Sequence, residues 1–136
     1  MPTRGFTLVE VMIVLAITAV LAATAIPIYQ NFVAKSQLTT ALAEIESGRS
    51  MVETALADAA GSTLVTAAYV GLSTTTVRCE NVQVSLNSNG RAALTCDVIG
   101  GSVVNGRTLS LQRTAADVWE CDAFAFDARY RPNGCE

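Results

Sequence analysis

"RGFTLVEVMIVLAITAVLAATAIPIYQ", the stretch from Arg4 to Gln30, decides how the whole chain is organised. Within it the run Val11–Ile26 has no charged residue, although 15% of the 136 residues of the chain are charged. At 1.5 Å per residue, the apolar residues from Phe6 to Ile28 would form a helix roughly 35 Å long, enough to cross a bilayer. The sequence therefore predicts a membrane-spanning helix, and Arg4 on its short side favours a cytoplasmic N-terminus.

Two residues are unusual in such a segment: Glu10 near its beginning and Pro27 near its end. A carboxylate costs about 2.5–3.5 kcal/mol at the centre of a bilayer and less near its surface. Glu10 is therefore either a functional residue with a partner or a bystander in the headgroup region. Pro27 has no N–H and leaves the carbonyl of Ala23 without its helical donor, for which the Thr24 hydroxyl is a candidate replacement. A static kink and a hinge are equally open at Pro27.

Two ordinary explanations of this segment fit it poorly. A secretory signal peptide would be cut after Ala23-Thr24-Ala25, but the apolar core is too long and is interrupted at its beginning by Glu10. Pro27 also lies only two residues beyond that cut. An uncleaved signal anchor explains the apolar run, but it explains neither Gly5 nor Glu10.

The heptapeptide Arg4–Glu10, RGFTLVE, resembles the leader junction of type IV prepilins. The resemblance implies that a prepilin peptidase cuts between Gly5 and Phe6, where a side chain would obstruct the enzyme, and then N-methylates Phe6. It also implies that the new α-amine of Phe6, a cation, pairs with Glu10 of a neighbouring subunit during assembly, because opposite charges attract strongly in an apolar setting. The similarity extends to Pro27 and implies a local loss of helix there in the fibre.

Beyond Pro27 the chain has the period of an amphipathic helix that continues to about Ala60 and ends at Gly61-Ser62. Its apolar residues recur three, four or seven positions apart, which places them on one helical face. We expect this face to pack on the domain that follows. Its members are Leu38, Leu42, Ile45, Val52 and Leu56.

The remaining residues have mostly the alternating pattern of β-strands. Apolar and polar residues alternate in Val82–Leu86 and in Leu94–Val98, and the turn residues Asn87–Gly90 lie between these two runs. A third strand is predicted at Leu109–Leu111 and a fourth at Trp119–Asp122. The pattern therefore predicts about four antiparallel strands.

All four cysteines follow the apolar segment, on the side that would be exported. An even number of cysteines in an exported domain favours two disulfides. A Trp-Glu-Cys motif that ends at Cys121 and a Tyr-Arg-Pro-Asn-Gly-Cys motif that ends at Cys135 resemble the C-terminal disulfide loop of type IVa major pilins. This resemblance implies a Cys121–Cys135 bond. Cys79 and Cys96 then form the second pair, on either side of the hairpin turn, as facing strand positions would.

The composition argues against catalysis. The chain has no histidine, which is the usual general base and the commonest metal ligand, and Lys35 is its single lysine. No phosphate-binding loop occurs in the sequence, and a net charge of −3 does not indicate a nucleic-acid-binding patch. We therefore expect no enzyme, no cofactor and no metal site.

The sequence as a whole predicts an α+β fold. A long N-terminal α-helix, with a membrane half and an amphipathic half, would pack on a roughly four-stranded antiparallel β-sheet with a C-terminal disulfide-bonded loop. The expected parts are a prepilin leader (1–5), a transmembrane and filament-core helix (6–28), an amphipathic helix (29–61) and a globular β-sheet head (62–136).

The resemblance implies a type IVa major pilin that polymerises into an extracellular pilus for adhesion, twitching motility and DNA uptake. Its expected partners are other copies of the chain, the prepilin peptidase, the pilus assembly machinery, the inner membrane before assembly, and surface receptors or DNA bound by the filament. A minor pilin and a pseudopilin of type II secretion share the same N-terminus and are alternatives. A membrane-anchored exported enzyme is the alternative from a different class.

Overall fold

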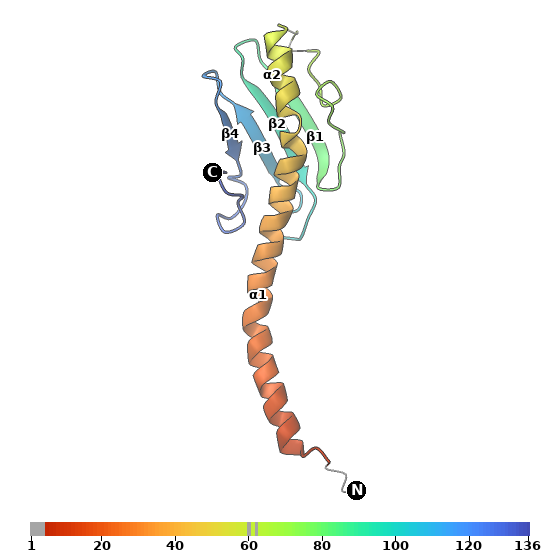
Figure 1. Cartoon of the computed structure of the whole chain (residues 1–136), viewed down its shortest axis with the longest axis vertical. Coiled ribbons are helices and arrows are strands. Elements are labelled where there is room, and N and C mark those ends of the chain that lie inside the picture. Colours follow the sequence, from red (N-terminus) through yellow and green to blue (C-terminus); the bar gives the residue numbers. More distant parts are fainter. Residues whose placement is uncertain (1–4, 60, 62) are drawn as a thin grey trace.

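The chain forms a long helical stalk with a β-sheet head at its far end (Figure 1). The computed structural model describes residues 5–59, 61 and 63–136, so most of the predicted leader, including Arg4, lies outside the described residues. Helix α1 spans Leu8–Glu46 and helix α2 spans Arg49–Ala57. The predicted helical rod to about Ala60 is confirmed in outline: it ends at Ala57 and is interrupted only by a short turn at Ser47-Gly48.

Packing explains the glycine at the turn between α1 and α2. Gly48 is buried, and a Cβ atom added to it would lie 2.7 Å from Leu72 and 3.0 Å from Leu94. Only glycine lets the backbone approach these two core side chains so closely. The hydroxyl of Ser47 donates to the carbonyl of Glu44 at 2.8 Å and satisfies one of the carbonyls freed at the end of α1.

The predicted sheet is confirmed as four antiparallel strands in the order β1-β2-β3-β4. The strands are β1 (Cys79–Leu86), β2 (Ala92–Val98), β3 (Thr108–Arg113) and β4 (Trp119–Asp122). Consecutive strands are neighbours throughout, so short turns connect them. The segment 63–78 has no helix or strand among its described residues.

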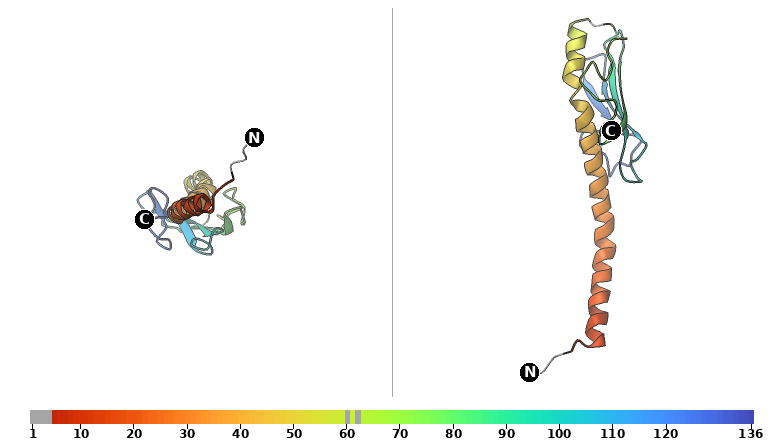
Figure 2. Two further views of the ribbon diagram at one scale, coloured as in Figure 1. Left: turned by 90° about the horizontal axis from the view of Figure 1, so that it is seen from below. Right: turned by 90° about the vertical axis from the view of Figure 1, so that its right-hand side faces the viewer.

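The core lies between one face of the sheet and the upper half of the helical stalk, which crosses that face (Figure 2). The predicted apolar face of the helix packs on the head, with Leu42 and Leu56 partly buried against the core. Small residues that the pattern had not included are buried as well, and they allow the helices to approach the sheet closely. The buried helical residues are Ala34, Leu38, Ala41, Ile45, Val52 and Ala55.

Both disulfides implied by the resemblance are present. Cys121–Cys135 joins β4 to the C-terminal segment with a Cα–Cα distance of 4.5 Å, and Cys79–Cys96 joins β1 to β2 at 5.2 Å. The expectation that Cys79 and Cys96 occupy facing positions was wrong, because Cys79 lies opposite Val98. An irregularity in β1 directly after Cys79 shifts the register, and the bond therefore runs diagonally across the hairpin.

Other segments cover both edges of the sheet. Along β1, the N–H of Val82 donates to the carbonyl of Thr74. Along β4, the N–H of Ala123 donates to the carbonyl of Glu136, whose own N–H donates to the carbonyl of Cys121. An uncovered edge strand is a template for pairing with other chains, so this arrangement limits uncontrolled strand addition by the head.

Candidate functional site

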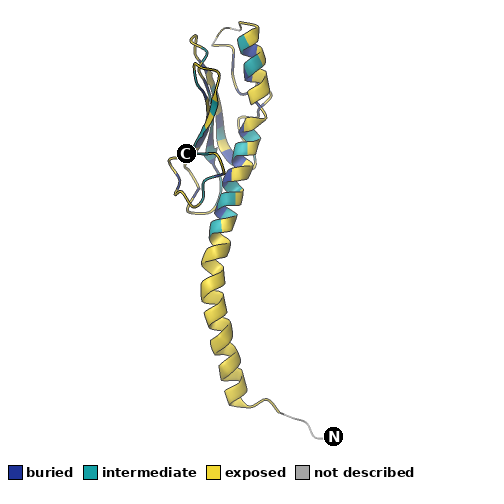
Figure 3. Cartoon of the chain, turned by 60° about the vertical axis from the view of Figure 1, so that its left-hand side comes forward, coloured by how far each residue is buried: buried dark blue, intermediate teal, exposed yellow. Residues whose placement is uncertain are grey.

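The lower half of α1 is an apolar surface without a covering layer. Every residue from 5 to 30 is exposed within the chain, whereas buried residues begin at Ala34, where the stalk reaches the head (Figure 3). Length and composition make this helix long and apolar enough to cross a membrane. A helix that is apolar all round is stable in lipid or among other apolar helices rather than in water.

The N-terminus of α1 is closed by a reciprocal pair of side chains. The Thr7 hydroxyl accepts from the N–H of Glu10 at 3.3 Å, and the Glu10 carboxylate accepts from the N–H and the hydroxyl of Thr7, each at 2.8 Å. This arrangement is a capping box, which satisfies donors that the first turn of a helix leaves unpaired. The sequence contains its signature, Thr7-x-x-Glu10, which was not among the predictions from the sequence.

The carboxylate of Glu10 nevertheless keeps one oxygen available. Within the described part of the chain, both hydrogen bonds to this carboxylate end on Oε2. Oε1 can therefore accept a further donor while Oε2 continues to cap the helix. Glu10 lies on an exposed first turn, so a donor from another molecule can approach it.

Gly5 and Phe6 precede the capping box and are exposed. A Cβ atom added at Gly5 would meet no described atom within 4 Å. The packing of the described residues therefore gives no reason for glycine at position 5. Phe6 is 80% exposed and has no apolar partner among the described residues.

The threonine hydroxyls of the apolar half bond within the helix. Thr18 donates to the carbonyl of Val14 at 2.9 Å, and Thr24 donates to the carbonyl of Leu21 at 2.9 Å. Such bonds remove the cost of a free hydroxyl in lipid. The helix continues through Pro27. The Thr24 hydroxyl was predicted to donate to the carbonyl of Ala23 in place of the missing proline N–H, but it donates to the carbonyl of Leu21 instead.

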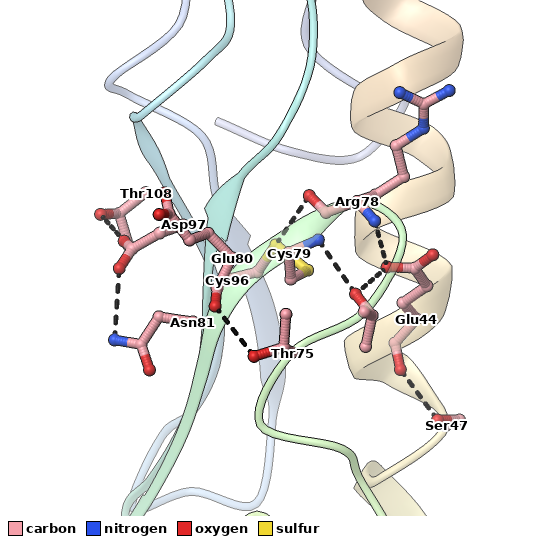
Figure 4. The surroundings of a disulfide bond; sticks show 11 residues. Glu44, Ser47, Thr75, Arg78, Cys79, Glu80, Asn81, Cys96, Asp97 and Thr108 are labelled. Atoms are coloured by element: carbon pink, nitrogen blue, oxygen red, sulfur yellow. Dashed lines mark hydrogen bonds between the residues drawn. A yellow bond between two sulfur atoms is a disulfide. The ribbon is translucent and has the colours of Figure 1, made fainter.

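Three polar side chains of α1 fasten the stalk to loops of the head. Lys35 Nζ donates to Asn133 Oδ1 at 2.9 Å, and Gln37 Oε1 accepts from the N–H of Gly101 at 2.9 Å. Glu44 holds the loop before β1 beside the buried Cys79–Cys96 bond (Figure 4). Its carboxylate accepts from the Thr76 hydroxyl and, at 3.2 Å, from the N–H of Arg78.

A charged cluster fastens α2 to β3 and β4. The Arg113 side chain is only 8% exposed, and its Nε and Nη2 donate to the two oxygens of Glu53 at 2.9 and 3.2 Å. Trp119 Nε1 donates to the same carboxylate at 2.7 Å, and Arg113 Nη1 donates to the carbonyl of Gly90 at 2.7 Å. The hydrogen bonds from Arg113 and then from Trp119 hold the pKa of Glu53 below its ordinary value, because they favour the ionised form.

The described residues contain no cluster of three or more histidine, cysteine, aspartate or glutamate side chains that could hold a metal ion. The main structural features of this chain are a capped helix terminus, an exposed apolar half of α1 and a head fastened to the other half. Such an arrangement is suited to packing against other molecules.

Comparison with known proteins agrees with this arrangement. Residues 34–136 match the pilin family of bacterial filaments, and residues 1–26 match the prokaryotic N-terminal methylation motif. Fimbrial protein Q of Moraxella bovis is 35% identical over 153 aligned positions, which cover 98% of this chain and 97% of that protein. The type IV major fimbrial protein FimA of Dichelobacter nodosus is 31% identical, with 98% and 96% covered.

A probable minor fimbrial protein of Dichelobacter nodosus is 33% identical, with 98% of this chain and 94% of that protein covered. The similarity to both kinds of fimbrial protein extends over nearly the whole length of each chain. Family membership implies polymerisation and processing by a prepilin peptidase. This chain therefore belongs to the type IV pilin family and is a structural, non-enzymatic subunit of a type IV pilus.

Proposed function

We propose that residues 6–28 first anchor the stored subunit in the inner membrane and then form the core of the extracellular pilus. One observation carries this proposal: the apolar lower half of α1 is exposed and projects from a folded head that has its own core. Moving from lipid into a bundle of similar helices keeps this surface dry throughout. Head-to-tail contacts that do not close into a ring produce a filament, and we assign residues 29–61 and 62–136 to its outer part.

The proposed processing site is the bond between Gly5 and Phe6, with residues 1–5 as the leader. It is supported by the exposure of both residues and by the absence of a described packing reason for Gly5. Mass spectrometry of the purified chain should find N-methylated Phe6 as the first residue. An N-terminus at Met1 would contradict processing, and one at Ile26 would indicate ordinary secretion. The variant Gly5→Val should retain the leader.

The proposed docking pair is the α-amine of Phe6 in one subunit and Glu10 in its neighbour. Oε1 of Glu10 is available for this contact while Oε2 caps the helix. An ion in an apolar environment is strongly favoured to pair with an opposite charge. Since both charges lie near the membrane surface, pairing can draw an incoming subunit into register with the growing end.

Two variants separate this pairing from the capping role of the same side chain. Glu10→Val should insert into the membrane and be processed, but it should be absent from sheared filaments. Thr7→Val removes the cap at a cost of about 1 kcal/mol and keeps the carboxylate, so it should still enter filaments. The pairing would be refuted by Glu10→Val filaments at the wild-type level. If both variants fail equally, the capping box rather than the ion pair supports assembly.

We also propose that Pro27 acts as a hinge and not only as a kink. The helix is continuous through Pro27 in the single chain, but one backbone hydrogen bond is necessarily missing there. Hydrogen exchange of the amides around residues 21–30 should be faster in the filament than in the detergent-solubilised subunit. Equal or slower exchange in the filament would favour a static kink.

For the assembled fibre we propose a major subunit that serves adhesion, twitching motility and DNA uptake together with the pilus assembly machinery. Sequence similarity does not separate the two ranks, because major and minor fimbrial proteins both match over nearly the full chain. Quantitative mass spectrometry of sheared pili should find this chain as the predominant component, whereas a minor pilin would be a small fraction. A deletion strain should lose surface attachment, twitching and transformation; a defect confined to protein secretion would indicate a pseudopilin.

A further inference from the structure

Three asparagines of the head are followed by glycine: Asn89, Asn105 and Asn133. All three are exposed, and each following glycine has a positive φ of 71–85°. An asparagine side chain can be attacked at Cγ by the backbone nitrogen of the next residue. Glycine permits this attack most readily because it has no Cβ to obstruct the approach. The three pairs are therefore chemically alike in sequence, and only their surroundings distinguish them.

The attacking nitrogen is occupied at two of these three positions. The N–H of Gly90 donates to the carbonyl of Asn87 at 3.0 Å, and the N–H of Gly106 donates to the carbonyl of Val98 at 2.8 Å. The N–H of Gly134 has no acceptor among the described residues. Since this nitrogen must lose its proton and turn toward Cγ, a hydrogen bond in the turn opposes the reaction at the first two positions and not at Gly134.

The amide carbonyls of the three asparagines also differ in their donors. Asn89 Oδ1 accepts from the N–H of Arg91, and Asn105 Oδ1 accepts from the N–H of Gly100, both at 3.1 Å. Asn133 Oδ1 accepts from the ammonium group of Lys35 at 2.9 Å. A cation at this distance polarises the carbonyl and stabilises the negative charge that develops on the oxygen during attack.

We propose that Asn133 is a self-modification site at which Lys35 promotes deamidation to an acidic residue. The nitrogen of Gly134 forms a bond to Cγ of Asn133 and gives its proton to water, and Lys35 stabilises the resulting oxyanion. The side-chain nitrogen then takes up a proton from water, its bond to Cγ breaks, and it leaves as ammonia. Water opens the five-membered imide at either carbonyl and yields aspartate or isoaspartate. The sum consumes one water and releases one ammonia, without an oxidant or reductant.

The product changes how the head is fastened to the stalk. Residue 133 becomes negatively charged next to Lys35, so the hydrogen bond between α1 and the C-terminal disulfide loop becomes an ion pair. The net charge of the chain changes from −3 to −4, because one neutral side chain becomes an anion. The converted fraction of Asn133 would therefore increase with the age of the subunit. This inference does not depend on filament assembly.

The test follows the three asparagines in the full chain during storage in detergent at neutral pH. They fall on three different tryptic peptides, so the mass difference between amide and acid can be measured separately for each after reduction. Peptides from a sample digested at the start correct for conversion during digestion. Asn133 should convert fastest in the folded chain. In reduced, denatured chain the three rates should become similar, since the turns and the Lys35 contact are gone.

Two substitutions of Lys35 test its role. Lys35→Met removes the charge and should slow conversion of Asn133 about fivefold, the size expected for one partly exposed charge interaction. Lys35→Arg keeps a cation and should slow conversion less. Asn89 and Asn105 serve as internal controls, and their unchanged rates, with both disulfides intact by mass, show that the variants are folded.

Three results would overturn the proposal. Conversion of Asn89 or Asn105 as fast as that of Asn133 in the folded chain would refute the selection by the glycine N–H. Equal rates at Asn133 in the wild type and Lys35→Met would refute the role of the cation. A peptide in which Lys35 is joined to residue 133 through an amide would show that Lys35 is itself the nucleophile.

Discussion

Removal of the Glu53 carboxylate tests how the head is held on the stalk. In the variant Glu53→Ala, Arg113 loses two hydrogen bonds to α2 and Trp119 Nε1 loses its acceptor. Arg113 would keep the Gly90 carbonyl and Asp117 as partners. The contact between α2 and the β3-β4 hairpin would then rest on apolar packing and on the Arg49 guanidinium, which lies 5.5 Å from the centre of the Trp119 ring.

The magnitude follows from burial. Removing one partner of a fully buried ion pair costs about 3–5 kcal/mol, and Arg113 meets this condition because its side chain is 8% exposed. The Glu53 side chain is 42% exposed, so water can replace part of what is lost. We therefore expect the free energy of unfolding to fall by about 2 kcal/mol, the size of a hydrogen bond to a charged group.

Urea denaturation of the full chain in detergent, followed by circular dichroism, measures this change. The matched control is Glu46→Ala, which removes an exposed carboxylate 4.0 Å from Arg49 and should cost about 0.5 kcal/mol or less. Circular dichroism is preferred to fluorescence because Trp119, the only tryptophan, is itself part of the cluster. Equal losses in Glu53→Ala and Glu46→Ala would refute the reasoning.

The same cluster predicts a pH dependence. Hydrogen bonds from Arg113 and from Trp119 lower the pKa of Glu53 in the folded chain, so the unfolded chain binds its proton at a higher pH. The stability that this carboxylate adds is therefore fully present above the pKa of an ordinary glutamate. It is lost as the pH falls through the lowered pKa of the folded state. Below that pH, wild type and Glu53→Ala should converge in stability; a constant difference would contradict the assignment.

Three further variants test the packing of the head by thermal unfolding in detergent. Gly48→Val should destabilise by at least about 1–3 kcal/mol because its side chain would collide with Leu72, and a neutral result would show that packing does not require glycine there. Leu38→Ala, at a fully buried site, should cost about 2–5 kcal/mol, and a smaller loss would mean that the head holds the stalk weakly. The double variant Cys121→Ser/Cys135→Ser should lose about 3 kcal/mol, whereas an unchanged midpoint would show that the loop is held without its disulfide.

Several features of this pilin could be predicted from local sequence because local physics determines them. The length of the apolar run predicts a helix of membrane length, since every backbone polar group must be satisfied within lipid. Alternation of apolar and polar residues around Asn87–Gly90 predicts a hairpin, because side chains alternate across a strand. The heptapeptide Arg4–Glu10 pointed to the family through its residues and their position, which needs no knowledge of the fold.

Other features depend on contacts between distant segments, and only the tertiary structure decides them. Position 48 requires glycine because Leu72 and Leu94 occupy the space beside it, and no pattern within the helix records those neighbours. Ala34, Ala41 and Ala55 are buried beside the predicted apolar residues because the sheet lies against their side of the helices.

The sequence contains the pattern of a capping box at Thr7 and Glu10. Only the structure shows that both hydrogen bonds from Thr7 end on the same oxygen of Glu10. The sequence by itself determined the parts of this subunit, namely an apolar rod, an amphipathic continuation and a disulfide-linked sheet. The tertiary structure decided how they are joined, because the contacts of Lys35, Gln37, Glu44 and Glu53 with the head connect residues 32 to 98 positions apart. Periodicity is a property of neighbouring residues, and it contains no information on such distant partners.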